Sequence, residues 1–122
     1  MNKKIENNPL CKIRKIYRAI DEYENKIVHA YGLSLNEGML LCCIQEYGKT
    51  SSTDIAKSLG LTCSNTSKVI KSLETKKVIK RSLANKDKRV MLFSITEEGK
   101  KKINAVMTDT KNLPAIIKEL EI

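Results

Sequence analysis

The chain has 122 residues and a net charge of +9 at neutral pH, and 41% of its side chains are hydrophobic. This length suits one domain with a single core, and the mixture of charged and aliphatic residues excludes a disordered or low-complexity chain. The longest apolar run, from Met39 to Ile44, is far shorter than the roughly 20 residues that a transmembrane helix needs. Charged residues also interrupt the N-terminal segment where a signal peptide would lie, so we expect a cytoplasmic protein without a membrane partner.

The first predicted element is a long amphipathic helix over residues 9–31. Asn8 followed by Pro9 is a typical helix start, and Gly32 is a typical C-terminal cap. Between them, apolar residues recur at helical spacing at positions Leu10, Ile13, Ile16, Tyr17, Ile20, Tyr23, Ile27 and Tyr31. This pattern places one apolar stripe along the whole helix.

Three further helices are predicted from their N-terminal capping residues. The caps are Ser34 with Glu37 three residues later, Ser51 with Asp54, and Thr62. The first of these helices is expected to be mostly buried. The last is expected to pack through an inner face made of Thr66, Val69, Ile70 and Leu73. Because only a short turn separates the last two helices, they match a helix-turn-helix.

After this motif the hydrophobic period changes to two, which is typical of strands. Residues 78–83 and 90–95 are predicted strands, and the polar segment 84–88 between them is the turn of a hairpin. Thr96 then begins a last helix, which Pro114 is expected to break or restart. The order of elements predicts a mainly α fold with a small β-hairpin wing, that is, a winged helix-turn-helix.

The apolar stripes of the two terminal segments exceed the partner surface that so small a chain offers. The C-terminal stripe consists of Ile103, Val106, Met107, Ile116, Ile117 and Leu120. We therefore expect a homodimer in which these stripes bury one another. In a single domain spanning 1–122, residues 1–31 and 100–122 would be the N- and C-terminal dimerisation helices that flank a winged helix-turn-helix core at 33–96.

The positive charge is concentrated in the middle of the chain. Residues 51–93 carry ten Lys or Arg against three acids, which accounts for +7 of the total of +9. A basic segment with few aromatic residues favours a duplex phosphate backbone over single-stranded nucleic acid. The alternative is a basic face that only confers solubility.

Five short motifs follow one another in the order found in a known family. They are Ser51 with Asp54-Ile55-Ala56, a helix over 62–74 that ends in Leu73-Glu74, Val78-Ile79-Lys80-Arg81, Asp87-Lys88-Arg89, and Ile95-Thr96-Glu97-Glu98-Gly99. In this order and spacing, the stretch from Gly32 to Ile103 resembles the multiple-antibiotic-resistance regulator (MarR) family of bacterial transcription factors.

Two features depart from the family pattern. Where members usually have glycine before the first wing strand, this chain has Lys77. If the backbone there is left-handed, lysine costs about 1 kcal/mol relative to glycine. The tail after Gly99 is also short and contains Pro114, so the C-terminal dimerisation helix is expected to be abbreviated.

The resemblance implies a sequence-specific regulator that binds a pseudo-palindromic operator in double-stranded DNA, and a repressor that a small amphipathic ligand releases. In the recognition helix, short polar side chains and long cations reach base edges and phosphates. These candidates are Ser64, Asn65, Ser67, Lys68 and Lys71. In the wing, the family pairs an Asp with an Arg that enters the minor groove, which assigns these roles to Asp87 and Arg89. Arg81, Lys86 and Lys88 would lie close by, and together with Lys76 and Lys80 the lysines predict an affinity that falls steeply with salt.

The four cysteines allow a second interpretation. Cys11 stands in a Leu-Cys context similar to that of the hydroperoxide-sensing relatives, and Cys63 lies at the positive end of the recognition helix. Either could make the chain a thiol-based oxidant sensor of the same fold, whereas Cys42 and Cys43 are expected in the core. Their spacing fits no zinc site, and we identify no catalytic constellation, so no metal, no cofactor and no enzymatic activity are expected. A winged-helix module that binds an acidic protein remains a further alternative.

Overall fold

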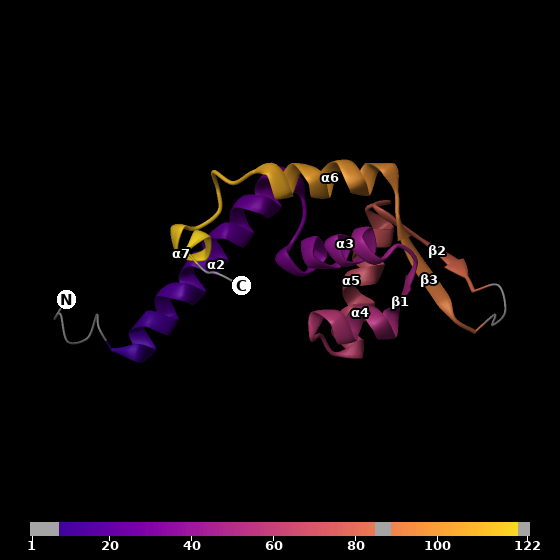
Figure 1. Cartoon of the computed structure of the whole chain (residues 1–122), viewed down its shortest axis with the longest axis horizontal. Coiled ribbons are helices and arrows are strands. Elements are labelled where there is room, and N and C mark those ends of the chain that lie inside the picture. Colours follow the sequence, from indigo (N-terminus) through magenta and orange to yellow (C-terminus); the bar gives the residue numbers. More distant parts are fainter. Residues whose placement is uncertain (1–7, 85–88, 120–122) are drawn as a thin grey trace.

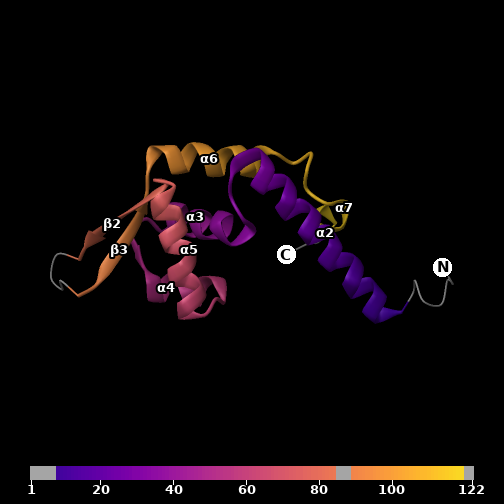
Figure 2. The ribbon, with the colours of Figure 1, turned by 180° about the vertical axis from the view of Figure 1, so that it is seen from behind.

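The computed structural model describes residues 8–84 and 89–119 (Figure 1). Its elements are α2 (Pro9–Tyr31), α3 (Leu35–Tyr47), β1 (Thr50–Ser51), α4 (Ser52–Leu59), α5 (Cys63–Thr75), β2 (Ile79–Leu83), β3 (Met91–Ile95), α6 (Glu97–Thr108) and α7 (Ala115–Lys118). The predicted winged helix-turn-helix is confirmed. Helix α2 extends away from the packed body, and the β2–β3 wing lies at the opposite end, as the view from behind also shows (Figure 2).

The helix starts are where the capping residues predict them. The Asn8 side chain accepts from the backbone N–H of Leu10 at 2.8 Å, and Ser34 forms a complete capping box with Glu37. The side chains of Ser51, Thr62 and Thr96 likewise accept from a backbone N–H three residues further on. These five helices therefore begin at a capping bond between residues two or three positions apart.

Helix α3 is the centre of the core. It contacts α4, α5, α6 and β3. Leu40, Leu41 and Ile44 on this helix are fully buried, and the recognition helix adds Leu73, which is also fully buried. The face predicted to turn inward on α5 is confirmed, since Thr66, Ile70 and Leu73 are buried. Helices α4, α5 and α6 and strand β3 therefore pack around α3.

The sheet has three antiparallel strands in the order β1-β3-β2. The register pairs Arg81 of β2 with Phe93 of β3, and Phe93 in turn with Thr50 of β1. The hairpin was predicted, but β1 was not. A strand of only two residues has no period that a sequence pattern could reveal.

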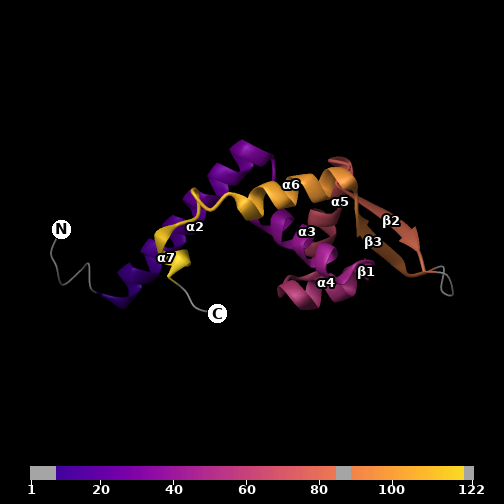
Figure 3. The same ribbon diagram turned by 45° about the horizontal axis from the view of Figure 1, so that its top comes forward.

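Helix α6 ends earlier than the sequence predicts. It stops at Thr108, so Leu113 lies outside it and only the short α7 follows Pro114. The Asp109 carboxylate explains the early end, because it accepts from the Tyr31 hydroxyl at 2.5 Å and from the Asn112 amide at 2.8 Å. These bonds turn the chain toward α2, and α7 lies beside α2 (Figure 3).

The connection from α5 to the wing contains Lys77, whose φ of 62° is left-handed. The condition under which lysine is strained at this position is therefore met. At the same junction, Gly99 packs closely against Val78. A Cβ at position 99 would lie 2.2 Å from the Val78 carbonyl oxygen. Glycine is thus required at the final position of the last motif.

Within the described ranges, no single helix is long and apolar enough to cross a membrane. The consecutive helices α2 and α3 pass that test only when taken together, across a bend of 71°.

Candidate nucleic-acid interface

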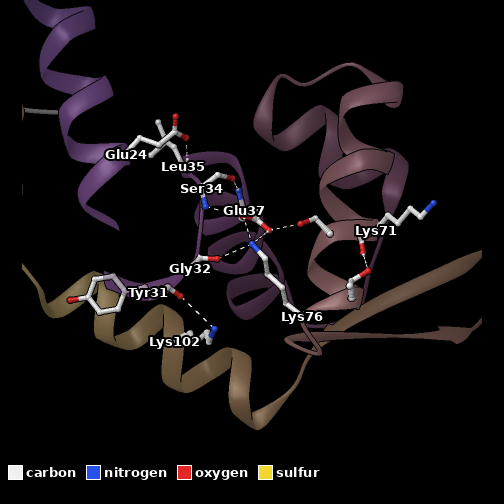
Figure 4. Close-up of polar contacts among 11 residues, drawn as sticks. Glu24, Tyr31, Gly32, Ser34, Leu35, Glu37, Lys71, Lys76 and Lys102 are labelled. Atoms are coloured by element: carbon white, nitrogen blue, oxygen red, sulfur yellow. Dashed lines mark hydrogen bonds and ion pairs between the residues drawn. The ribbon is translucent and has the colours of Figure 1, made fainter. Parts of the chain in front are cut away.

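The outer face of α5 carries the polar side chains that the sequence assigns to recognition. All five are exposed: Ser64, Asn65, Ser67, Lys68 and Lys71. The opposite face of the helix packs into the core, so the helix cannot turn without exposing Leu73. In Figure 4 the Lys71 side chain points away from the polar contacts on the inner side of the helix. A helix held in this way presents short polar groups and cations to solvent as one surface.

A groove of about 560 Å³ lies between α5, the start of α4 and the wing. Its walls combine hydroxyl groups with cations, namely Ser51, Ser52, Thr53, Ser67, Lys71, Arg81 and Arg89. The N-terminus of α4 adds backbone N–H groups and the positive end of a helix dipole. Such a set of donors suits phosphate oxygens.

Arg81 joins the wing to the recognition helix. Its guanidinium donates to both carboxylate oxygens of Glu74, with Nε to Oε2 at 2.6 Å, and lies 5.7 Å from the centre of the Phe93 ring. This ion pair raises the pKa of Arg81 and lowers the pKa of Glu74. Arg81 thereby neutralises the carboxylate that lines the groove.

The remaining predicted wing residues divide into two sets. Arg89 is exposed and lines the groove with Lys71. Lys86, Asp87 and Lys88 lie outside the described residues. The predicted Asp–Arg pair of the wing therefore stays a prediction.

The cysteines lie in different environments. Cys63 is exposed at the first turn of α5, whereas Cys11 is half-buried on α2. Cys43 is buried as predicted, and Cys42 is half-buried with its Sγ 3.8 Å from the Sδ of Met107. Burial raises the pKa of both the Cys42 and the Cys43 thiols. The prediction of a core position is confirmed for Cys43, whereas Cys42 lies at the edge of the core.

One polar cluster was missed by sequence reasoning. Glu37 was interpreted only as a helix cap, and Lys76 only as a cation for phosphates. In the structure the Lys76 ammonium contacts both carboxylate oxygens of Glu37 at 2.8 Å (Figure 4). The two residues are 39 positions apart, so no local pattern relates them.

A second cavity, an apolar cleft of about 380 Å³, is separate from the groove beside α5. It lies among α2, α3, α4 and α6, and its lining includes Tyr23, Leu35, Met39, Cys42, Ile103 and Met107. Apolar walls with a few polar groups are typical of sites for small organic ligands.

The comparisons with known proteins agree with this geometry. The profile of the MarR family matches residues 33–91, which contain the helix-turn-helix and most of the wing. Over this stretch the chain is similar to the MarR family. Its curated relatives include the HTH-type transcriptional regulator MhqR of Bacillus subtilis, at 28% identity over 80% of this chain and 67% of MhqR. Another is the B. subtilis HTH-type transcriptional regulator YwaE, at 30% identity over 74% of this chain and only 53% of YwaE, so the chain spans about half the length of that relative.

Solved structures of MarR-type regulators share the fold. The S. aureus MepR–DNA complex superposes with a TM-score of 0.80 at 20% identity, covering 93% of this chain and 85% of MepR. Bordetella bronchiseptica BpsR, whose DNA binding 6-hydroxynicotinic acid regulates, superposes with a TM-score of 0.76 at 18% identity over 88% of this chain and 77% of BpsR. At these identities the likeness establishes the fold of the chain.

Proposed function

We propose that the chain is a transcriptional regulator of the MarR type that binds double-stranded DNA with α5 in the major groove and the wing beside it. The observation that carries the proposal is the exposed polar and cationic face of α5, which continues into the groove that ends at Arg89. Ser64, Asn65, Ser67, Lys68 and Lys71 are the recognition-helix contacts. The proposed wing contacts are Lys86, Asp87, Lys88 and Arg89. Arg81 pairs with Glu74 and so neutralises the negative charge of that carboxylate in the groove.

The active unit is a homodimer. Large apolar side chains on the N-terminal half of α2 remain open to solvent, with Leu10 75%, Ile13 49% and Tyr17 60% exposed. Helix α7 brings the half-buried Ile116 and Ile117 to the same region. A second copy related by a two-fold axis would cover these faces, and two-fold symmetry then requires a pseudo-palindromic operator.

The apolar cleft beside Cys42 and Met107 is the place for a small amphipathic ligand that releases a repressor from its operator. The cleft is walled by α2 and α6 on one side and by α3 and α4 on the other, so a ligand there contacts both the dimerisation helix and the DNA-binding unit. The alternative trigger is oxidation of a thiol, for which the exposed Cys63 on the DNA-facing helix is the best-placed group.

A salt titration of DNA binding tests the proposal. Duplexes enriched from a randomised library by the wild type are labelled, and affinity is measured from about 50 to 200 mM salt, where several phosphate contacts produce a log–log slope steeper than about −4. Arg89→Ala should abolish tight binding, while Lys100→Ala, on the exposed side of α6, should leave it within about twofold. Sedimentation equilibrium should give twice the monomer mass. A wild type that enriches no duplex contradicts the proposal and favours a module that binds an acidic protein.

A further inference from the structure

Glu37 is a buried carboxylate with four polar contacts. It lies in the first turn of α3 and is only 6% exposed. Its oxygens accept from the Lys76 ammonium at 2.8 Å, from the Ser72 hydroxyl at 2.8 Å and from the backbone N–H of Ser34 at 2.9 Å. The same ammonium donates to the Gly32 carbonyl oxygen at 2.7 Å. One carboxylate and one ammonium thus connect three separate segments (Figure 4).

The contacts of Glu37 connect the end of α5 to the corner between α2 and α3. Ser72 and Lys76 belong to the last turn and the C-cap of the recognition helix α5. Gly32 and Ser34 form the corner at which α2 turns into α3. On the other side of that corner, the carboxylate of Glu24 on α2 accepts from the backbone N–H of Leu35 at 2.7 Å. The recognition helix is therefore bonded, through Glu37, to the corner that Glu24 attaches to α2.

The contacts of Glu37 differ from those of the other acid on this side of the molecule. Glu74 pairs with Arg81 at the solvent-facing groove, and its side chain is 23% exposed, whereas the side chain of Glu37 is only 7% exposed and its partner Lys76 reaches it from the surface. An enclosed carboxylate whose lone pairs are all directed at fixed donors tolerates little change in their mutual position. The Glu37–Lys76 pair is thus suited to holding α5 at a constant angle to α2.

We propose that Glu37 and Lys76 are positioning residues that determine which half-site spacing the protein accepts. The inference rests on the proposed function, in which α2 forms the dimer and α5 enters the major groove. In such a dimer, the orientation of α5 relative to α2 sets the distance between the two recognition helices. Half-sites one helical turn apart, roughly 10 base pairs, are matched only if that orientation is held constant.

The experiment measures spacing discrimination rather than affinity alone. A duplex enriched by the wild type is remade with one base pair inserted or deleted at its centre, which displaces and rotates one half-site relative to the other. The wild type should bind the original duplex at least about tenfold more tightly than either altered one. Glu37→Gln should reduce this preference to about threefold or less. Removing a negative charge would by itself strengthen binding to all three duplexes equally, so electrostatics and positioning predict different results.

Glu97→Gln is the matched control. It makes the same change of charge and breaks the exposed pair of Glu97 with Lys100 at the start of α6, a pair that involves neither Glu37 nor Lys76. It should keep the wild-type preference. Lys76→Arg, which retains the cation, should keep most of the preference, and Lys76→Gln should lose it. If Glu37→Gln fails to fold in a thermal melt, these two Lys76 variants decide the question.

The outcomes separate the two proposals. A wild type that enriches no duplex removes the proposed function, and the inference with it. A wild type that discriminates between spacings, together with folded Glu37→Gln or Lys76→Gln variants that discriminate equally well, overturns the inference alone. A loss of affinity that is the same for all three duplexes also overturns it, because a purely structural role predicts that pattern.

Discussion

The two faces of the recognition helix serve different purposes. The inner face is buried through Thr66, Ile70 and Leu73, and Ser72 on its flank donates to Glu37. The outer face presents short polar groups and lysines to solvent. The side chains that stabilise the fold therefore lie on one side of α5, and those proposed to contact DNA lie on the other. Substitutions on the inner face should therefore change mainly stability and those on the outer face mainly DNA affinity, whereas the Glu37–Lys76 pair at the end of the helix is expected to affect both.

The largest expected effect is on the inner face. Leu73→Ala removes a fully buried side chain from the core and should lower the free energy of unfolding by about 3 kcal/mol. Urea denaturation followed by circular dichroism measures this loss. The fraction that remains folded should still bind DNA with nearly wild-type affinity, since Leu73 does not face the groove.

Acid should lower the free energy of unfolding by protonating Glu37, which holds the end of α5 through Ser72 and Lys76. Burial raises the pKa of its carboxyl, but the bonds from Lys76, the Ser34 N–H and Ser72 outweigh burial and hold the pKa below its usual 4.5. A lowered folded-state pKa means that this stabilisation is complete above about 4.5 and is lost as the pH falls through the folded value. Glu37→Gln should therefore cost about 2 kcal/mol at pH 7, the value of hydrogen bonds to a charged group, and progressively less toward pH 3.

Urea titrations of both proteins across this pH range measure the difference. Glu74 and Asp109 also have lowered pKa values, so both proteins lose stability in acid, and only the gap between them reports on Glu37. A gap that stays constant with pH would show that the charge of Glu37 contributes nothing.

The junction between the helix and the wing should gain stability from glycine. Lys77→Gly relieves a left-handed lysine and should raise the free energy of unfolding by about 0.5 to 1 kcal/mol. Lys77→Ala removes the same charge but keeps the Cβ, so it should bring no such gain. A thermal melt of the three proteins distinguishes relief of backbone strain from removal of charge.

The smallest effect on stability is expected on the outer face. Lys68→Ala should change the free energy of unfolding by less than about 0.5 kcal/mol, because the side chain is exposed. Its effect should be on DNA instead, where the slope of log affinity against log salt should become shallower by about 0.9 for the lost phosphate contact. An unchanged slope would remove Lys68 from the interface.

The features that the sequence by itself determined are those made by neighbouring residues. The caps at Asn8, Ser34 and Thr62 bond within two or three positions, so they are readable as local patterns. The sequence marked Lys77 as the place where glycine is usual in the MarR family, but the left-handed backbone there came from the structure. The polar face of α5 followed from the helical period once its inner face was known.

Only the tertiary structure decided the features that depend on distant partners. Helix α6 ends at Thr108 because Tyr31, 78 positions before Asp109 in the chain, binds its carboxylate. Strand β1 exists because β3 supplies its hydrogen-bonding partner. Lys76 was expected on DNA phosphates, yet its ammonium lies on Glu37, since folding brings α3 against the end of α5. A short-range pattern specifies where a helix begins, but the partner of a long side chain is set by which elements pack together.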